Sequence, residues 1–137
     1  MGRRSAILSG VAHLFVYGTL LPGEVRWHHL EPFVADAGVA DSAAGDLFDT
    51  GCGYPAARFG GDRTIHGHTF PLRSSLIVEA LRVLDEVEGA VAGLYVRTRV
   101  ATGRGLVVWS YEYGDGLALE PIRSGSWRAH RTGGAPD

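Results

Sequence analysis

The sequence contains no lysine, no asparagine and no glutamine. Without lysine the chain cannot form a Schiff base, and without side-chain amides it cannot build an oxyanion hole from Asn or Gln. All 13 basic residues are arginines. We interpret this composition as the coding bias of a GC-rich genome, and we expect a bacterial source.

Cysteine is almost absent as well, since Cys52 is the only one. A single cysteine cannot form an internal disulfide, so nothing indicates an oxidising compartment. Cys52 stands between two glycines, and no sequence feature supplies its thiol with a base. A bystander thiol is therefore the default interpretation, and a nucleophilic cysteine is the minor alternative.

Long apolar runs and an excess of positive charge are also missing. The apolar stretch near the N-terminus is too short and too interrupted for a signal peptide or a membrane-spanning helix, so we expect a cytoplasmic protein. A net charge of −2 provides no electrostatic attraction to nucleic acids or anionic membranes. Neither is an expected partner, and the sequence leaves the oligomeric state open.

The chain of 137 residues has the length of one typical domain. A chain of this size should bury roughly 65–70% of its unfolded surface, so one core is feasible without metal or disulfide support. We expect a loose leader over residues 1–12, a single domain over 13–130 and a flexible tail over 131–137.

Many short, β-prone segments are separated by glycine-rich turns. The first is the apolar segment 13–17, which Gly18 ends. Further strands are predicted over residues 34–48, as two short strands with a bend, and over 56–59, 65–72, 94–101 and 106–113. About seven strands and a helix packed against them predict an α+β fold built on a small barrel or a strongly curved sheet.

One helix is clearly predicted, after Ser74 or Ser75, either of which can act as its N-cap. Its apolar positions follow a 3.6-residue spacing. We expect Gly89 to end it, in the usual glycine position after a helix. Residues 24–33 leave room for a helical turn.

Glu88 lies on the apolar stripe of this helix. The series Ile77, Leu81, Leu84, Glu88 steps by four, three and four residues, so the carboxylate continues the buried face. Burial and the negative end of the helix dipole both disfavour its charged form and raise its pKa. Such a group suits acid/base work near neutral pH. The alternatives are a frayed helix end that turns Glu88 to solvent, and a structural ion pair with an arginine.

A second candidate feature is the turn formed by Tyr17, Gly18, Thr19 and Leu20, directly after the first predicted strand. Gly18 allows a sharp turn with unobstructed N–H groups. Successive N–H groups in such a turn form a nest that binds anions, carboxylates included, and Thr19 adds a hydroxyl donor. An ordinary strand-ending turn is the alternative. The turn lacks the lysine and glycine pattern of a P-loop, so we do not expect a nucleotide.

Two ordered motifs resemble the signatures of the γ-glutamylcyclotransferase-like superfamily, which includes the AIG2-like group. The first is Phe-Val-Tyr-Gly-Thr-Leu at 15–20, and the second is Leu-Asp-Glu-Val-Glu-Gly at 84–89, followed by Tyr-Val-Arg at 95–97. Shorter similar segments lie at 53–56, 65–67, 107–111 and 124–128. The resemblance covers about residues 13–130, and the ordered pair is more specific than either motif alone.

This resemblance implies a small mixed barrel with flanking helices and a substrate that carries a γ-glutamyl group on an amine or an amino acid. The enzyme would form 5-oxoproline and release the amine, with Glu88 as acid/base and the turn from Tyr17 to Leu20 as the nest. No metal or cofactor is required. One departure is His68, where the family often has an acidic residue. It bears on the pocket or the leaving-group preference, and not on the glutamate or the nest.

Two other functions stay open beside this one. The chain could be a non-catalytic binding module of the same fold, or a cyclotransferase that removes a γ-glutamyl protecting group during the biosynthesis of a secondary metabolite. The presence of Glu88 favours an enzyme over a binding module. The sequence does not separate the two kinds of enzyme.

Aromatic and histidine residues supply the remaining candidates. Tyr95 and Tyr111 lie on late strands and could line the pocket, with core packing as the alternative. His66 and His68 share a strand face, but no carboxylate or cysteine has the spacing of a metal site. We therefore expect no metal.

Overall fold

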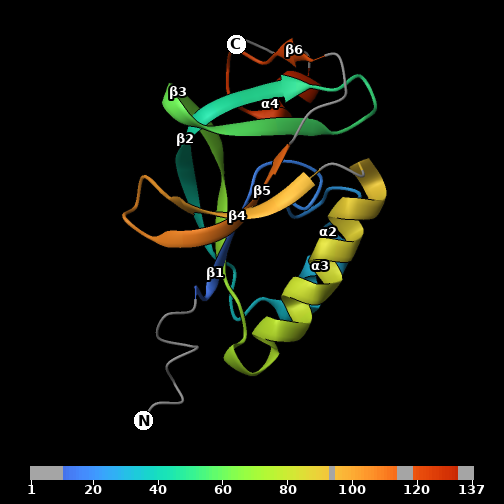
Figure 1. The fold of residues 1–137 in the computed structure, drawn as a ribbon, viewed down its shortest axis with the longest axis vertical. Coiled ribbons are helices and arrows are strands. Elements are labelled where there is room, and N and C mark those ends of the chain that lie inside the picture. Colours follow the sequence, from blue (N-terminus) through green and yellow to red (C-terminus); the bar gives the residue numbers. More distant parts are fainter. Residues whose placement is uncertain (1–10, 93–94, 114–118, 133–137) are drawn as a thin grey trace.

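The computed structural model describes residues 11–92, 95–113 and 119–132 (Figure 1). Its strands are β1 (His13–Val16), β2 (Val39–Asp49), β3 (Pro55–Pro71), β4 (Tyr95–Ala101), β5 (Val107–Tyr113) and β6 (Glu120–Pro121). Its helices are α2 (Trp27–Leu30), α3 (Ile77–Ala92) and α4 (Trp127–Arg131), with 3-10 turns at Glu31–Phe33 and Ser74–Leu76. Most of the predicted leader and tail lies outside the described residues.

The strands form one mixed sheet of six strands in the order β4-β5-β1-β3-β2-β6. The central strand β1 pairs antiparallel with β3 and parallel with β5. The sheet curls back on itself, because a bridge joins Ala43 on β2 to Thr102 after β4, and the Gly103 N–H donates to the Ser42 carbonyl at 2.8 Å. The predicted small mixed barrel with flanking helices is confirmed, with six strands in the described residues instead of about seven.

Strands β2 and β3 are longer than predicted. The segments 34–48 and 56–72 were each expected to form two strands, but each contains one continuous strand that pairs with the other. Residues 60–63, which include two glycines, form a bulge, since Gly45 pairs with Phe59 while Ala44 pairs with Thr64. A bulge bends a strand without ending its ladder, which is why the glycine-rich segment does not separate two strands.

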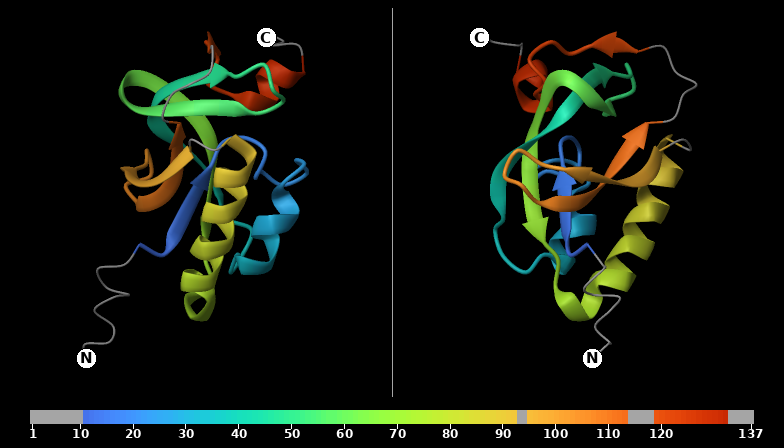
Figure 2. Two further views of the ribbon diagram at one scale, coloured as in Figure 1. Left: turned by 45° about the vertical axis from the view of Figure 1, so that its right-hand side comes forward. Right: turned by 60° about the vertical axis from the view of Figure 1, so that its left-hand side comes forward.

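Side chains on the two faces of β1 enter two different cores, as the period of two in a strand requires. Phe15 packs inside the curled sheet with Ile65, Val108 and other apolar residues. Leu14 and Val16 pack on the opposite face in a second core. This second core is covered by α2 and α3, which lie side by side (Figure 2).

The helices differ from the sequence prediction at three points. No side-chain bond from Ser74 or Ser75 caps α3, because both serines lie in the preceding 3-10 turn. Helix α3 continues through Gly89 to Ala92. Helix α4, which was not predicted, is capped by Ser126, whose side chain accepts from the Ala129 N–H at 3.2 Å.

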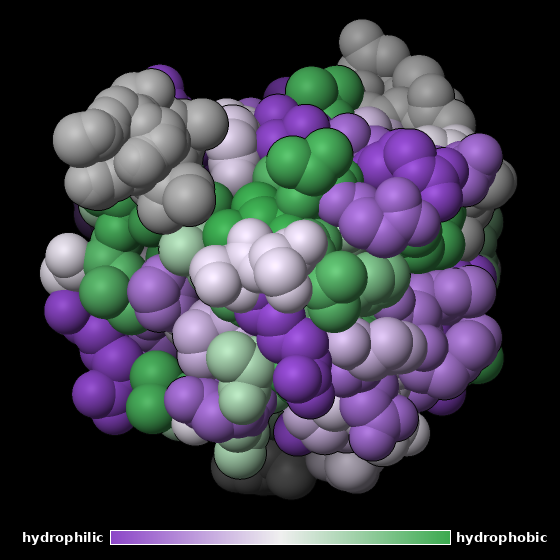
Figure 3. Space-filling model, turned by 90° about the horizontal axis from the view of Figure 1, so that it is seen from below, coloured by the Kyte–Doolittle hydropathy of each residue, from purple (hydrophilic) through white to green (hydrophobic). Residues whose placement is uncertain are grey.

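The described surface carries no large apolar face in the direction of Figure 3, where apolar and polar residues are intermingled. Among the described helices, none combines the length and the apolar character needed to cross a bilayer.

Candidate functional site

A pocket of about 390 Å³, its open mouth included, lies at the carboxyl end of β1. It is lined by the end of β1 and the turn that follows, by the end of the β2–β3 connection, and by α3, β4 and β5. The lining contains every residue that the sequence predicted for the site, namely Tyr17, Gly18, Thr19, Leu20, Glu88, Tyr95 and Tyr111. The fold thus brings these residues together, while their chemical roles stay predictions.

The predicted burial of Glu88 is confirmed, since its side chain belongs to the pocket wall and the residue is only 8% exposed. Burial raises the pKa of its carboxyl from 4.5 to about 7, and the charge of Arg26 opposes this rise. No hydrogen bond between described residues involves this carboxylate. It is therefore a carboxyl group that can exchange a proton near neutral pH without first breaking a bond to another described side chain.

The turn after β1 leaves its N–H groups free. The Leu21 N–H donates to the Gly18 carbonyl at 3.0 Å, which closes a tight turn over residues 18–21. No hydrogen bond among the described residues uses the N–H groups of Gly18, Thr19 or Leu20 as donors. Three successive donors therefore lie in the pocket wall, and such an arrangement binds anions.

Glycine is needed at position 18 because of a close approach. A Cβ added there would lie 2.5 Å from Cγ and 2.8 Å from Cδ of Pro55, another pocket residue. Described glycines with positive φ lie elsewhere in the chain, and Gly18 does not have such a φ. The sequence analysis correctly identified glycine as important at position 18. The structural reason is the close contact with Pro55 and not a backbone conformation that favours glycine.

Four of the chain's five tyrosines line the pocket, and three of them donate their hydroxyls to other groups of the protein. Tyr17 donates to the Tyr111 carbonyl at 2.6 Å, and Tyr95 donates to the Pro55 carbonyl. Tyr111 donates to Oδ1 of Asp85 at 2.7 Å. Burial raises the pKa of all three phenols, so they stay neutral at pH 7.

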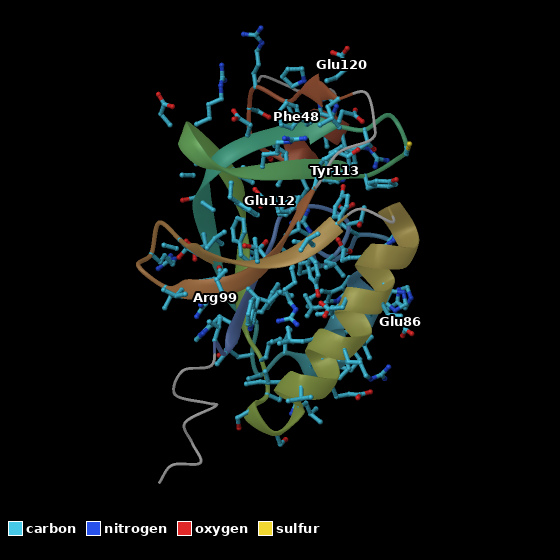
Figure 4. The ribbon with its side chains drawn as sticks, in the orientation of Figure 1. Phe48, Glu86, Arg99, Glu112, Tyr113 and Glu120 are labelled. Carbon is cyan, nitrogen blue, oxygen red and sulfur yellow. The ribbon has the colours of Figure 1, made fainter. Side chains whose placement is uncertain are left out.

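Tyr95 and Tyr111 belong to both the pocket and the core, which the sequence had left as alternatives. Both line the pocket, and both also pack in the core beneath α2 and α3. Tyr113, labelled in Figure 4, supports Tyr95 from behind, with the two rings edge to face at 5.6 Å between centroids. The wall beside the candidate acid is thus built of packed aromatic rings.

The structure places other candidates away from the pocket wall. Cys52 is exposed in the β2–β3 connection, where its thiol contacts the Thr50 carbonyl at 3.7 Å. The ring of His68 bonds to the Ala37 carbonyl through Nε2 at 2.9 Å, and this residue does not line the pocket. Among the described residues, no three His, Cys, Asp or Glu side chains gather as metal ligands would.

Sequence reasoning missed Arg26, Tyr54 and Pro55. Tyr54 and Pro55 belong to one of the shorter similar segments, so a signal for them existed, but they were not assigned to the site. Arg26 belongs to no motif. Its guanidinium carbon lies 5.9 Å from the centroid of the Tyr54 ring, at the rim of the pocket.

Comparisons with known proteins agree with this architecture. A family model described as "Gamma-glutamyl cyclotransferase, AIG2-like" matches residues 14–129. An uncharacterised protein of Pyrococcus horikoshii superposes with a TM-score of 0.70 at 20% identity, over 89% of this chain and 94% of that one. YkqA of Bacillus subtilis gives 0.70 at 23% identity, over 92% of this chain and 43% of its own.

A solved gamma-glutamyl cyclotransferase superposes with a TM-score of 0.53 at 19% identity, over 90% of this chain and 80% of its own. At these identities the structures have a fold in common. No curated protein matches the sequence.

Proposed function

Because the chain belongs to the AIG2-like gamma-glutamyl cyclotransferase family, we propose that it is an enzyme that cyclises a γ-glutamyl amine or a γ-glutamyl amino acid. The products are 5-oxoproline and the free amine. The observation that carries the proposal is that the buried carboxyl of Glu88 and the free N–H groups of the turn after β1 line the same pocket.

The reaction is an intramolecular aminolysis. The substrate's α-amine attacks its own γ-carbonyl carbon, which forms the C–N bond of a five-membered lactam, and the original amide C–N bond then breaks. At pH 7 the α-amine is an ammonium group that cannot attack. Glu88, as a carboxylate, removes one proton from it so that the neutral amine can attack. After the attack this nitrogen gives up a second proton, and both protons pass through Glu88 to the departing nitrogen, which leaves as an ammonium group.

The raised pKa of Glu88, at about 7, suits both halves of this task. A carboxyl group with an ordinary pKa would be a weak base toward the ammonium and would return its proton less readily as an acid. A group that titrates near the working pH is present in both forms. The buried position that raises the pKa also keeps bulk water from competing for the proton.

The N–H groups of Gly18, Thr19 and Leu20 would supply the electrostatic part of the catalysis. They can hold the substrate's α-carboxylate, or the carbonyl oxygen as negative charge develops on it. The aromatic wall would hold the glutamyl chain in the folded shape that brings amine and carbonyl together, and such orientation supplies much of the rate of a ring closure. The chemistry is neither redox nor hydrolytic, so it needs no cofactor.

The proposal is tested by measuring 5-oxoproline release from a panel of γ-glutamyl amines and amino acids. We expect Glu88→Gln to lower kcat/KM roughly 100- to 10,000-fold, the usual range for a lost acid/base group, while the fold stays intact. The matched control is Glu86→Gln on the same helix. Glu86 projects into solvent, with its side chain 77% exposed (Figure 4), so its substitution should leave the rate within about twofold.

An unchanged rate in the Glu88→Gln protein would overturn the mechanism. Binding of γ-glutamyl compounds without turnover by any of them would favour the non-catalytic module. Turnover confined to a large biosynthetic γ-glutamyl amine would favour the deprotecting cyclotransferase, which uses the same residues.

A further inference from the structure

Arg26 carries a guanidinium group with no carboxylate partner. Among the described residues, no carboxylate lies within salt-bridge distance of it, and its side-chain contact is with the face of Tyr54, at 5.9 Å from the ring centroid. Arg26 is half-buried. A guanidinium group that keeps its donors free beside a pocket is suited to binding a carboxylate, since its planar fork matches two carboxylate oxygens.

The backbone holds Arg26 close to the free N–H groups of the turn. The segment after that turn folds back, and the Arg26 N–H donates to the Thr19 carbonyl at 2.8 Å. The next residue begins α2, whose first turn is closed by the His29 N–H donating to the Arg26 carbonyl at 3.0 Å. These bonds tie the backbone of Arg26 to the turn that lines the pocket, and the contact with the Tyr54 ring places its guanidinium beside that pocket.

The other arginines close to the pocket are already paired. Arg97 forms two bonds with Asp85, at 2.8 and 3.2 Å. Arg128, which reaches the same loop as Arg26, pairs with Glu24 at 3.4 Å. Within the described part of the chain, Arg26 is also the charge that acts on Glu88. A substrate anion at this rim would therefore meet Arg26.

Arg26 lies over the ring of a lining residue but is not itself part of the pocket lining. In the proposed reaction the glutamyl part of the substrate occupies the pocket, beside Glu88 and the free N–H groups. With the glutamyl part so placed, the leaving group would extend from the γ-amide toward the mouth. Because Arg26 lies outside the lining that would hold the α-carboxylate, its guanidinium would be available to the leaving group.

We propose that Arg26 binds a carboxylate on the leaving group, and that the preferred substrates are consequently γ-glutamyl amino acids over γ-glutamyl amines that lack this carboxylate. This inference rests on the proposed function. The charge balance supports it, because the Glu88 carboxylate would repel an anionic leaving group, and a facing cation offsets that repulsion. A cationic leaving group would be repelled by Arg26.

The test uses two substrates that differ only in the leaving-group carboxylate, γ-glutamyl-L-alanine and γ-glutamyl-ethylamine. We expect kcat/KM to be roughly 10- to 100-fold higher for the alanine compound, as for a charge-assisted hydrogen-bonded pair. Arg26→Met retains a chain that can lie on Tyr54 but removes the charge, and it should collapse this ratio to within about threefold. The control Arg73→Met removes an exposed arginine at the opposite end of α3 and should retain the ratio.

Calorimetric binding of the same two compounds to Glu88→Gln protein separates this inference from the proposed function. Tighter binding of the alanine compound that disappears on adding Arg26→Met supports the carboxylate site, even if the wild-type protein releases no 5-oxoproline. Turnover with equal kcat/KM for both substrates would overturn the inference and leave the proposed function standing. An equal loss on both substrates in Arg26→Met would also overturn it, because it would mean that Arg26 acts only through Glu88.

Discussion

A single carboxyl group shows how burial creates a chemical property. Glu88 lies on the apolar stripe of α3, and its pKa is raised to about 7 because burial disfavours its charge. The described groups that act electrostatically with it are Tyr17 directly after β1, Tyr95 on β4, Tyr111 on β5 and the opposing cation of Arg26. The three phenols stay neutral, so the charge of Arg26 is what opposes the effect of burial on the pKa of Glu88.

This pKa has a consequence for stability. In the folded protein the pKa is raised from 4.5 to about 7, so the folded state binds the proton more tightly than the unfolded state. The associated stabilisation is fully present below about pH 4.5 and is lost as the pH rises through about 7. Its size is about 3 kcal/mol, from about 1.4 kcal/mol for each pKa unit.

We therefore expect Glu88→Gln to be more stable than the wild type at pH 8, by up to about 3 kcal/mol, and nearly equal to it at pH 5. Urea unfolding of both proteins at the two pH values measures their free energies of unfolding. Both proteins contain the same histidines, so the effect of histidine titration cancels when one free energy is subtracted from the other. Glu86→Gln is the control and should show no such dependence. A gap that is the same at pH 5 and pH 8 would contradict the raised pKa.

At the scale of the element, α3 shows that a glycine near the expected end of a helix does not always end it. A glycine directly after the last position of the buried stripe is typical of a helix end, yet α3 continues through Gly89 to Ala92. Gly89 does not have the positive φ of a terminating glycine, and a Cβ added to it would meet no atom within 4 Å. The packing of α3 along the sheet and α2 sustains the helix past a residue of low helix propensity.

Gly89→Ala is accordingly expected to stabilise the protein by about 0.5–1 kcal/mol, the usual gain for this change inside a helix. Thermal or urea unfolding measures it. Gly67→Ala is the opposite control, because its Cβ would collide with the Val16 carbonyl and the Phe15 ring and should destabilise the fold. A loss of stability in Gly89→Ala would mean that the helix ends there after all.

At the scale of the whole molecule, one carboxylate ties together the segments that close the barrel. Asp41 on β2 accepts from the Thr69 hydroxyl of β3 at 2.8 Å and from the Arg104 N–H in the β4–β5 turn at 3.2 Å. Burial acts to raise the pKa of Asp41, but the hydrogen bonds from Ser42, Thr102, Thr69 and Arg104 outweigh it and lower the pKa below 3.8.

Asp41→Ala should therefore destabilise the protein by about 1–3 kcal/mol at pH 7, as expected for removing the acceptor of several bonds. The pKa of Asp41 is lower in the folded than in the unfolded protein, so its carboxylate stabilises the fold at pH values above 3.8. The difference in stability between the wild type and Asp41→Ala should therefore shrink as the pH falls below 3.8. Asp62→Ala, in the exposed β3 bulge, is the control. Equal stability of the two variants at pH 7 would contradict the closing role of Asp41.

The sequence predicted more of the site than of the fold's connections. The phase of α3 placed Glu88 on the buried face, and the motif after β1 identified the turn from Tyr17 to Leu20. Both depend on neighbours within one element. The long strands β2 and β3 were predicted as shorter pieces, because a bulge and a loop have the same glycine-rich composition and only pairing distinguishes them.

The sequence by itself determined which local elements form and which face of each is apolar, because periodicity and turn chemistry act over a few residues. Only the tertiary structure decided why position 18 must be glycine, since the reason is the contact with Pro55. It also decided that the hydroxyls of Tyr17, Tyr95 and Tyr111 bond to the protein. The position of Arg26 at the pocket rim, without a carboxylate partner among the described residues, is likewise a tertiary feature. These features depend on contacts between segments that are far apart in the sequence, and the pattern within one segment does not predict such contacts.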